Sequence, residues 1–246
     1  MRNAPAQTNA PAPPHFPSRE QLFEDQRRLL PDARLILDVG AHHGQSSLLY
    51  LDKFPAARVF AFEPESANFA VCSSALAHVC DQVRVIRQAV TDHDDRVTLH
   101  INTHDGTHSL FEIGEQRFWA GYAAKRGEAE VPAVTIDSFL EQEGISAVDI
   151  LKMDIQGAEL AALNGARKAL QEARIGLVAC EVEFKELYRG QPLFWDVGAR
   201  LALDGYNLFG LYDCFYHPRN PNVLAWADAI FIGPRLQNVP EWSSAA

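Results

Sequence analysis

The sequence predicts an α/β fold in which helices cover both faces of a mostly parallel sheet. From Arg34 onward, short apolar runs typical of buried strands alternate with longer segments of helical pattern. This alternation favours a parallel sheet, because parallel strands need a long crossover connection that is usually a helix. The first apolar run also passes through a glycine-containing turn, residues 40–44, directly into a helical segment. Ligands of such sheets bind beyond the carboxyl ends of the strands, so the residues that follow each strand are the candidate site.

The elements are predicted in chain order from their apolar patterns and their capping residues. Ser18 is a candidate N-cap, and acidic residues follow it in the early turns of a helix that ends near Pro31. The next predicted elements are strand 35–39, helix 45–54, strand 58–62, helix 66–78, strand 83–87 and an extended segment 97–102. The last ones are strand 148–153, helix 158–172, strand 175–180, helix 194–203, and strands 206–212 and 229–232.

The predicted organisation is one domain with short flanking segments. The stretch 103–130 is rich in glycine, histidine and aromatic residues without a clear period, so it is interpreted as an insertion over the sheet edge and a candidate lid. The expected parts are a flexible proline-rich tail 1–17, an N-terminal helix 18–33, a domain 34–235 and a C-terminal tail 236–246.

Composition narrows the class of protein. Hydrophobic residues make up 47% of the 246 residues and charged residues 22%, as in ordinary soluble globular proteins. The net charge of −10 argues against a nucleic acid as the main partner, because phosphates would be repelled on average. Four scattered cysteines without metal-binding spacing, and no segment typical of a secretory signal or membrane span, favour a cytoplasmic protein that does not contact a membrane. Oligomeric state is open, with a homo-oligomer as one possibility.

The turn after the first strand and an acid after the second form the strongest candidate for a nucleotide-type site. In the turn, Asp38, Gly40, Ala41 and Gly44 are expected to bind the cofactor, since glycine lets the backbone approach a ligand closely. Glu63 comes twenty-five residues after Asp38, near the spacing at which an acid accepts hydrogen bonds from ribose hydroxyls. A plain strand–helix turn and a surface glutamate are the alternatives.

The glycine pattern separates two possible cofactors. A dinucleotide favours G-x-G-x-x-G, but His42 stands at the second glycine and would crowd the pyrophosphate. S-adenosylmethionine carries no phosphate and tolerates this turn. The pattern therefore favours S-adenosylmethionine over NAD.

Carboxylates after two later strands are candidate catalytic or metal-binding groups. Asp154 follows strand 148–153, where it is suited to act as a base, to orient the donor's cationic part or to bind a cation; a helix N-cap is the alternative. Glu181 and Glu183 share one face of the next strand. With Asp154 they are a candidate Mg²⁺ site.

Histidines and aromatic residues supply further candidates. His108 is the favoured general base, because a neutral imidazole accepts a proton near neutral pH. His42 and His43 border the cofactor turn, and His104 lies in the insertion. A plain polar surface is the alternative for all four. Aromatic candidates for an acceptor pocket are Phe111, Phe118, Trp119 and Tyr122.

Several segments resemble the FkbM family of methyltransferases in both order and spacing. The resemblance covers most of residues 34–233. Its segments are residues 37–41 with Gly44, 62–64, 89–92, 134–137, 151–159, 163–166, 205–206 and 228–231.

The resemblance implies a Rossmann-like class I methyltransferase fold, a seven-stranded sheet with a reversed last strand, and methyl transfer usually to a hydroxyl oxygen of a small molecule, natural product or sugar. It implies that Gly40 contacts the methionine portion of the donor and Glu63 the ribose. Gln88 and Ala89 would border the adenine, and Asp154 would approach the methionine amino group or the reaction centre. His42 and His43 depart from the family pattern, which often has asparagine and an aliphatic residue there.

Two other functions stay open from the sequence. An NAD-dependent oxidoreductase uses a similar sheet, and a non-catalytic binding protein would keep the fold without the chemistry. Titration with both cofactors discriminates the first alternative, and donor binding without methyl transfer would favour the second.

Overall fold

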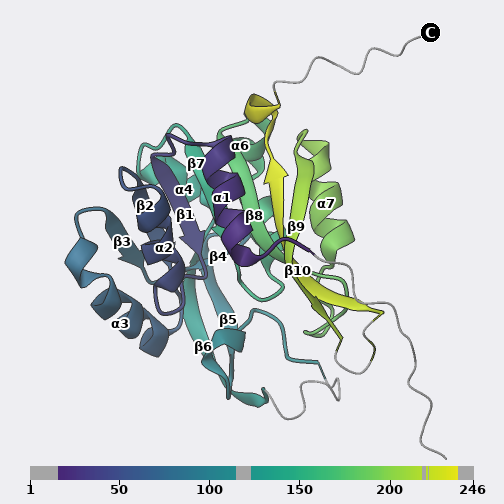
Figure 1. Ribbon diagram of the computed structural model, residues 1–246. Coiled ribbons are helices and arrows are strands. Elements are labelled where there is room, and N and C mark those ends of the chain that lie inside the picture. The colour runs from purple at the N-terminus through teal and green to yellow at the C-terminus, as the bar shows by residue number, and fades with distance from the viewer. Residues whose placement is uncertain (1–15, 115–122, 218–219, 221, 238–246) are drawn as a thin grey trace, which may run out of the picture.

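The computed structural model describes residues 16–114, 123–217, 220 and 222–237 (Figure 1). Most of the two predicted tails, and the candidates Phe118, Trp119 and Tyr122, lie outside the described residues.

The strands are β1 Leu35–Val39, β2 Arg58–Phe62, β3 Val83–Ile86, β4 Ala89–Val90, β5 Asp95–Asn102, β6 Lys125–Val134, β7 Val148–Met153, β8 Ile175–Glu183, β9 Asn207–Tyr216 and β10 Leu224–Ile232. The helices are α1 Arg19–Leu29, α2 Gln45–Lys53, α3 Ser66–Ala75, α4 Ile136–Gln142, α5 Glu159–Asn164, α6 Arg167–Gln171 and α7 Phe194–Leu203, with short 3₁₀ turns η1 Ala77–Val79, η2 Asp105–Thr107 and η3 Pro234–Leu236.

The main sheet has seven strands in the order β3-β2-β1-β7-β8-β10-β9. Neighbouring strands from β3 to β8 pair in parallel, whereas β10 pairs antiparallel with both β8 and β9. The last strand of the chain is therefore the reversed one. The predicted α/β fold with a mostly parallel seven-stranded sheet is confirmed.

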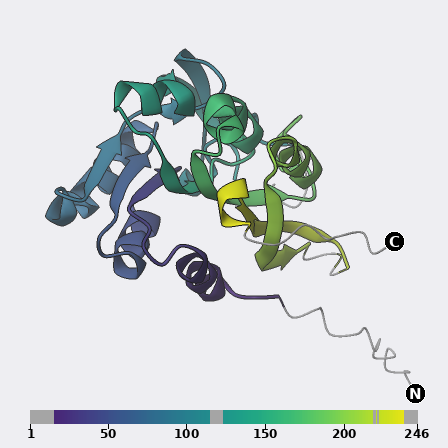
Figure 2. The same ribbon diagram turned by 90° about the horizontal axis from the view of Figure 1, so that it is seen from above.

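Alternate side chains of each central strand enter two separate cores. In β1, Ile36 belongs to a core shared with α1, α2 and α3, while its neighbour Leu37 belongs to a core shared with α4, α5, α6 and α7. Figure 2 shows these helices on opposite sides of the sheet. Buried on both faces, the strands are apolar almost throughout, which is why their sequences lack a polar alternation.

A second, three-stranded sheet lies below the carboxyl ends of the parallel strands (Figure 1). Its order is β4-β6-β5, and β6 pairs antiparallel with β5 from Asn102–Lys125 to Asp95–Ala133. The expected insertion 103–130 therefore ends earlier than predicted, because its last residues belong to β6. The first half of β6, residues 125–130, is mostly charged and largely exposed. Only its pairing with β5 therefore identifies it as a strand.

One predicted helix is divided. The segment 158–172 forms α5 and α6, with a break at Gly165. A Cβ at Gly165 would lie 2.0 Å from the backbone oxygen of Thr91, so the chain passes closer to that loop than a side chain permits. Likewise, the predicted helix 66–78 ends at Ala75 and continues only as η1.

The first helix packs onto the main sheet. Ser18 caps it as predicted, with its Oγ accepting from the backbone N–H of Gln21 at 3.3 Å. Leu22 and Phe23 enter the core beside α2. Among the described residues, no helix is long and apolar enough to cross a membrane.

Candidate active site

The turn after β1 approaches the loop after β7 so closely that only glycine fits at its first position. Gly40 has a φ of +79°, and its N–H donates to the oxygen of Phe62 at 3.0 Å. A Cβ there would lie 2.0 Å from the backbone oxygen of Asp154. Both the conformation and the space therefore require glycine. The contact joins the carboxyl ends of β1, β2 and β7 into one site.

The Asp38 side chain connects this turn to α2 and to Lys152 of β7. Its fully buried carboxylate accepts from Ser46 and Ser47 hydroxyls, each at 2.6 Å, and pairs with the Lys152 ammonium at 3.0 Å. Lys152 also donates to the oxygen of Gly40 at 2.9 Å. The Asp38 oxygens thus serve the start of α2 and the buried lysine, and cofactor binding by Asp38 stays a prediction.

A cavity of about 810 Å³, including its open mouth, lies at the carboxyl ends of β1, β2 and β7. Five residues expected to contact the donor line it: Gly40, Glu63, Gln88, Ala89 and Asp154. Asp38, Ala41 and Gly44 are not among its lining residues. Ala41 is buried and Gly44 is the N-cap position of α2, so these residues shape the turn rather than the cavity wall.

Glu63 is the most constrained carboxyl group of the cavity wall. It is 6% exposed, and its two oxygens accept from the backbone N–H groups of His42 at 3.0 Å and Glu65 at 2.9 Å. Burial raises the pKa of Glu63 to about 7. The two backbone donors orient the carboxylate and leave its other lone pairs for ligand hydroxyls.

Gln156 organises the loop after β7, although the sequence assigned it no role. Its Nε2 donates to Asp154 at 3.0 Å and to Glu181 at 2.9 Å, and its Oε1 accepts from the Tyr188 hydroxyl at 2.7 Å. Its backbone oxygen accepts from Ser109 at 2.6 Å. Gln156 thus connects Asp154 to β8 and to the loop after β5. The one local signal is its place in the D-I-Q-G-A-E run, between the strand and α5.

The predicted Mg²⁺ site is not supported. Within the described part of the chain, Asp154, Glu181 and Glu183 are not among the groups whose ligand atoms all lie within 4.8 Å of one another. An amide of Gln156 stands between Asp154 and Glu181 instead of an ion. Burial raises the pKa values of Glu181 and Glu183, with nearby carboxylates adding to the effect, so both hold protons more tightly than exposed acids.

His108 lines the cavity, but its hydrogen bond opposes the predicted role of a general base. Its Nδ1 accepts from the backbone N–H of Asn102 at 3.1 Å. Burial lowers the pKa of His108, which favours the neutral ring. A neutral ring whose Nδ1 accepts carries its proton on Nε2, so it presents a donor rather than a base. The role of His108 as a general base stays a prediction.

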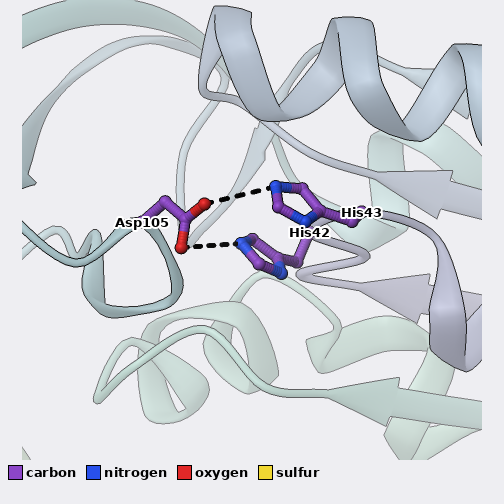
Figure 3. Close-up of side chains that lie close together, drawn as sticks. All are labelled: His42, His43 and Asp105. Atoms are coloured by element: carbon purple, nitrogen blue, oxygen red, sulfur yellow. Dashed lines mark ion pairs between the residues drawn. The ribbon is translucent and has the colours of Figure 1, made fainter.

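His42 and His43 meet Asp105 at the mouth of the cavity. Their rings stack with centroids 3.7 Å apart, and both Nε2 atoms face the carboxylate, as Figure 3 shows. The His42 Nε2–Asp105 distance is 3.5 Å and the His43 Nε2–Asp105 distance is 3.3 Å. Burial and the neighbouring His43 lower the pKa of His42. The predicted loop histidine His104 lies beside this group, 4.0 Å from Asp105.

Several known proteins with similar sequences are named as methyltransferases. The methyltransferase FkbM domain matches residues 38–208. The 2-O-methyltransferase NoeI of Sinorhizobium fredii is 26% identical over 64% of this chain and 66% of its own length. Methyltransferase 1 of Beauveria bassiana is 28% identical over 55% of this chain and 59% of its own length. The matches therefore span less than two thirds of these relatives.

A solved structure shows the same fold. Methyltransferase FkbM from Methylobacillus flagellatus superposes with a TM-score of 0.54 at 20% identity, over 82% of this chain and 44% of that one. The sheet order and the cavity at the carboxyl ends of its strands define a Rossmann-like α/β protein of the class I methyltransferase type. Because the domain match covers most of the chain, the protein belongs to the FkbM methyltransferase family.

Proposed function

We propose that this protein transfers the methyl group of S-adenosylmethionine to a hydroxyl oxygen of a small molecule. The observation that carries the proposal is the pairing of the Gly40 turn with Glu63 across one cavity. The absence of a Cβ at Gly40 lets this turn pack against the backbone of Asp154, which brings both loops to the cavity wall. The buried carboxylate of Glu63, oriented by two backbone N–H groups, would accept hydrogen bonds from the two ribose hydroxyls. Family membership and the similarity to NoeI, which is named a 2-O-methyltransferase, support the transfer to oxygen.

The cavity offers a separate partner for each part of the donor. Gly40 and Asp154 would hold the methionine portion, with the carboxylate of Asp154 facing its positive charge. Glu63 would bind the ribose, and Gln88 with Ala89, where β3 passes into β4, would border the adenine. The order of these residues across the sheet edge, from β7 through β1 and β2 to β3, matches the order of the groups along the donor.

In the proposed step, the acceptor oxygen forms a bond to the methyl carbon while the carbon–sulfur bond breaks. The sulfonium becomes the neutral thioether S-adenosylhomocysteine, and the hydroxyl proton leaves to a base or to water. Because the sulfonium is already activated, the chain mainly aligns the two reactants and excludes water. Gln156 would serve this alignment by fixing Asp154.

Calorimetric titration of the purified protein with S-adenosylhomocysteine tests the cofactor assignment, and NAD titrated in parallel tests the alternative. We expect one S-adenosylhomocysteine site and no heat from NAD, since His42 occupies the space that a pyrophosphate needs. Incubation with S-adenosylmethionine and hydroxylated sugars then tests transfer by the mass gain of one methyl group. Binding of NAD alone would overturn the proposal.

Replacing Glu63 with glutamine should weaken S-adenosylhomocysteine binding by roughly 10- to 100-fold, because one amide cannot replace a carboxylate that accepts from two backbone groups and two hydroxyls. Glu141→Gln removes the same charge from an exposed site on α4 and is the matched control. Equal affinities of the two variants, measured by calorimetry, would contradict the ribose assignment.

The affinity of the wild-type protein should also depend on pH. Burial raises the pKa of Glu63 to about 7, and ribose hydroxyls donate to the ionised form, so binding should release a proton below that pH. Between pH 6 and pH 8 we expect affinity to rise by about tenfold, following the ionised fraction of such a group. Glu63→Gln should abolish the rise. A rise that persists in Glu63→Gln would assign it to another group, such as His42.

A further inference from the structure

We propose that His42, His43 and Asp105 form a binding site for a divalent transition metal ion of the Zn²⁺ type. The two histidines come from the turn after β1, and Asp105 comes from η2, which faces that turn (Figure 3). One ligand atom from each of the three lies within 4.8 Å of the other two. An ion at this place would join the glycine turn to the loop after β5.

The distances fit metal ligands better than hydrogen bonds. The two Nε2–carboxylate distances are 3.5 and 3.3 Å, longer than the usual 2.7–3.2 Å of a good hydrogen bond. Ligand atoms about 2.0–2.1 Å from a tetrahedral ion lie about 3.3 Å from one another. The Nε2 of His42 is buried without a hydrogen-bond partner. The two Nε2–carboxylate spacings are therefore close to those of neighbouring ligand atoms around one tetrahedral ion.

The backbone conformation of His42 explains how the two rings come together. Its φ is +50°, in the left-handed region that histidine adopts more often than most other non-glycine residues. In this conformation the His42 ring stacks on the His43 ring, and both imidazoles face Asp105.

A second group in the described residues, His100 with Glu112 and Glu128, meets the same distance criterion but is already neutralised. The Lys125 ammonium donates to Glu112 at 2.9 Å and to Glu128 at 2.6 Å, so an ion would have to displace it. Among the described residues, no lysine or arginine forms an ion pair with Asp105, whose partners are His42, His43 and His104. The ligand types decide the metal, because two imidazoles and one carboxylate suit Zn²⁺ and its neighbours rather than Mg²⁺ or Ca²⁺.

The proposed ion would lie at the wall of the donor cavity, which His42 and Asp105 line. Three protein ligands leave at least one position of a tetrahedral ion for water or for a bound molecule. This inference goes beyond the proposed methyl transfer and does not require it, since metal binding is measured without donor or acceptor.

The test uses the untagged protein, residues 1–246, stripped of metal with a chelator. Zn²⁺ is titrated in competition with a chromophoric chelator, and Co²⁺ is added separately to record the visible absorption of a tetrahedral site. We expect one equivalent of each ion. His43→Ala and Asp105→Ala should weaken Zn²⁺ binding by at least about 100-fold, because even the outer partners of metal ligands contribute 10- to 100-fold.

His100→Ala is the matched control, since it removes an imidazole from the lysine-neutralised group and should leave the affinity unchanged. Circular dichroism and thermal unfolding of the metal-free variants show whether each has folded. Absence of Zn²⁺ binding by the wild-type protein, or equal affinity in the double variant His42→Ala/His43→Ala, would overturn the inference. Failure of S-adenosylhomocysteine to bind while Zn²⁺ binds would overturn only the proposed function.

Discussion

Gly40→Ala is expected to destroy the donor site, lowering S-adenosylhomocysteine affinity by more than about 100-fold and destabilising the protein by roughly 3 kcal/mol. The added Cβ would lie 2.0 Å from the backbone oxygen of Asp154, on a residue whose φ is +79°. The turn after β1 and the loop after β7 must then separate. Because both loops line the cavity, the separation displaces its walls as well as straining the fold.

The matched control is Gly198→Ala in α7. There the nearest atom to an added Cβ is a Phe231 ring carbon at 4.0 Å, so alanine fits. Alanine favours the helix by up to about 1 kcal/mol over glycine. Calorimetry and thermal unfolding of both variants separate a local clash from a general intolerance of alanine. Wild-type affinity in Gly40→Ala would contradict the close approach of the two loops.

Lys152→Met is expected to lower the free energy of unfolding by about 3–5 kcal/mol, since removing one partner of a buried pair leaves an uncompensated charge on the other. Burial by itself lowers the pKa of Lys152, but the carboxylates of Asp38 and Asp154 outweigh it, so the net shift is upward and the ammonium is retained. Asp38 has no exposed surface through which water could replace the lysine. In thermal unfolding, the midpoint should fall by roughly 10 °C for a chain of this size.

Two further variants isolate the charge from the loss of the side chain. Lys53→Met removes a lysine that pairs with Glu24 at the surface, where solvent screens the pair, and its midpoint should match the wild type. Adding Asp38→Asn to Lys152→Met removes the carboxylate charge that has lost its partner, so it should restore part of the lost free energy of unfolding. If the double variant were less stable than Lys152→Met, the hydrogen bonds from Ser46 and Ser47 to the Asp38 carboxylate would contribute more to stability than its unpaired charge costs. That result would contradict the expected recovery.

The positions of most elements follow from the sequence because they depend on local composition. Apolar runs bounded by turn residues mark β1, β2, β7 and β8, and each is buried on both faces in the structure. Strand β6 lacks such a pattern because the residues in its first half, 125–130, are mostly charged, and only its pairing with β5 identifies it as a strand. Helix α5 ends where the backbone of Thr91 approaches Gly165, a contact between segments far apart in the chain.

Sequence alone determined the α/β fold and the family resemblance. It also placed Gly40, Glu63 and Asp154 directly after strands, because the end of a strand is a local feature. Parallel strands then bring these ends to one edge of the sheet. Only the tertiary structure decided which side of that edge each carboxyl group faces. It buries Asp38 against Lys152 and exposes Glu63 to the cavity, although both lie at the end of an apolar strand. It also brings Asp105 to His42 and His43 across about sixty residues of chain, because such contacts depend on how two loops pack and not on any local pattern.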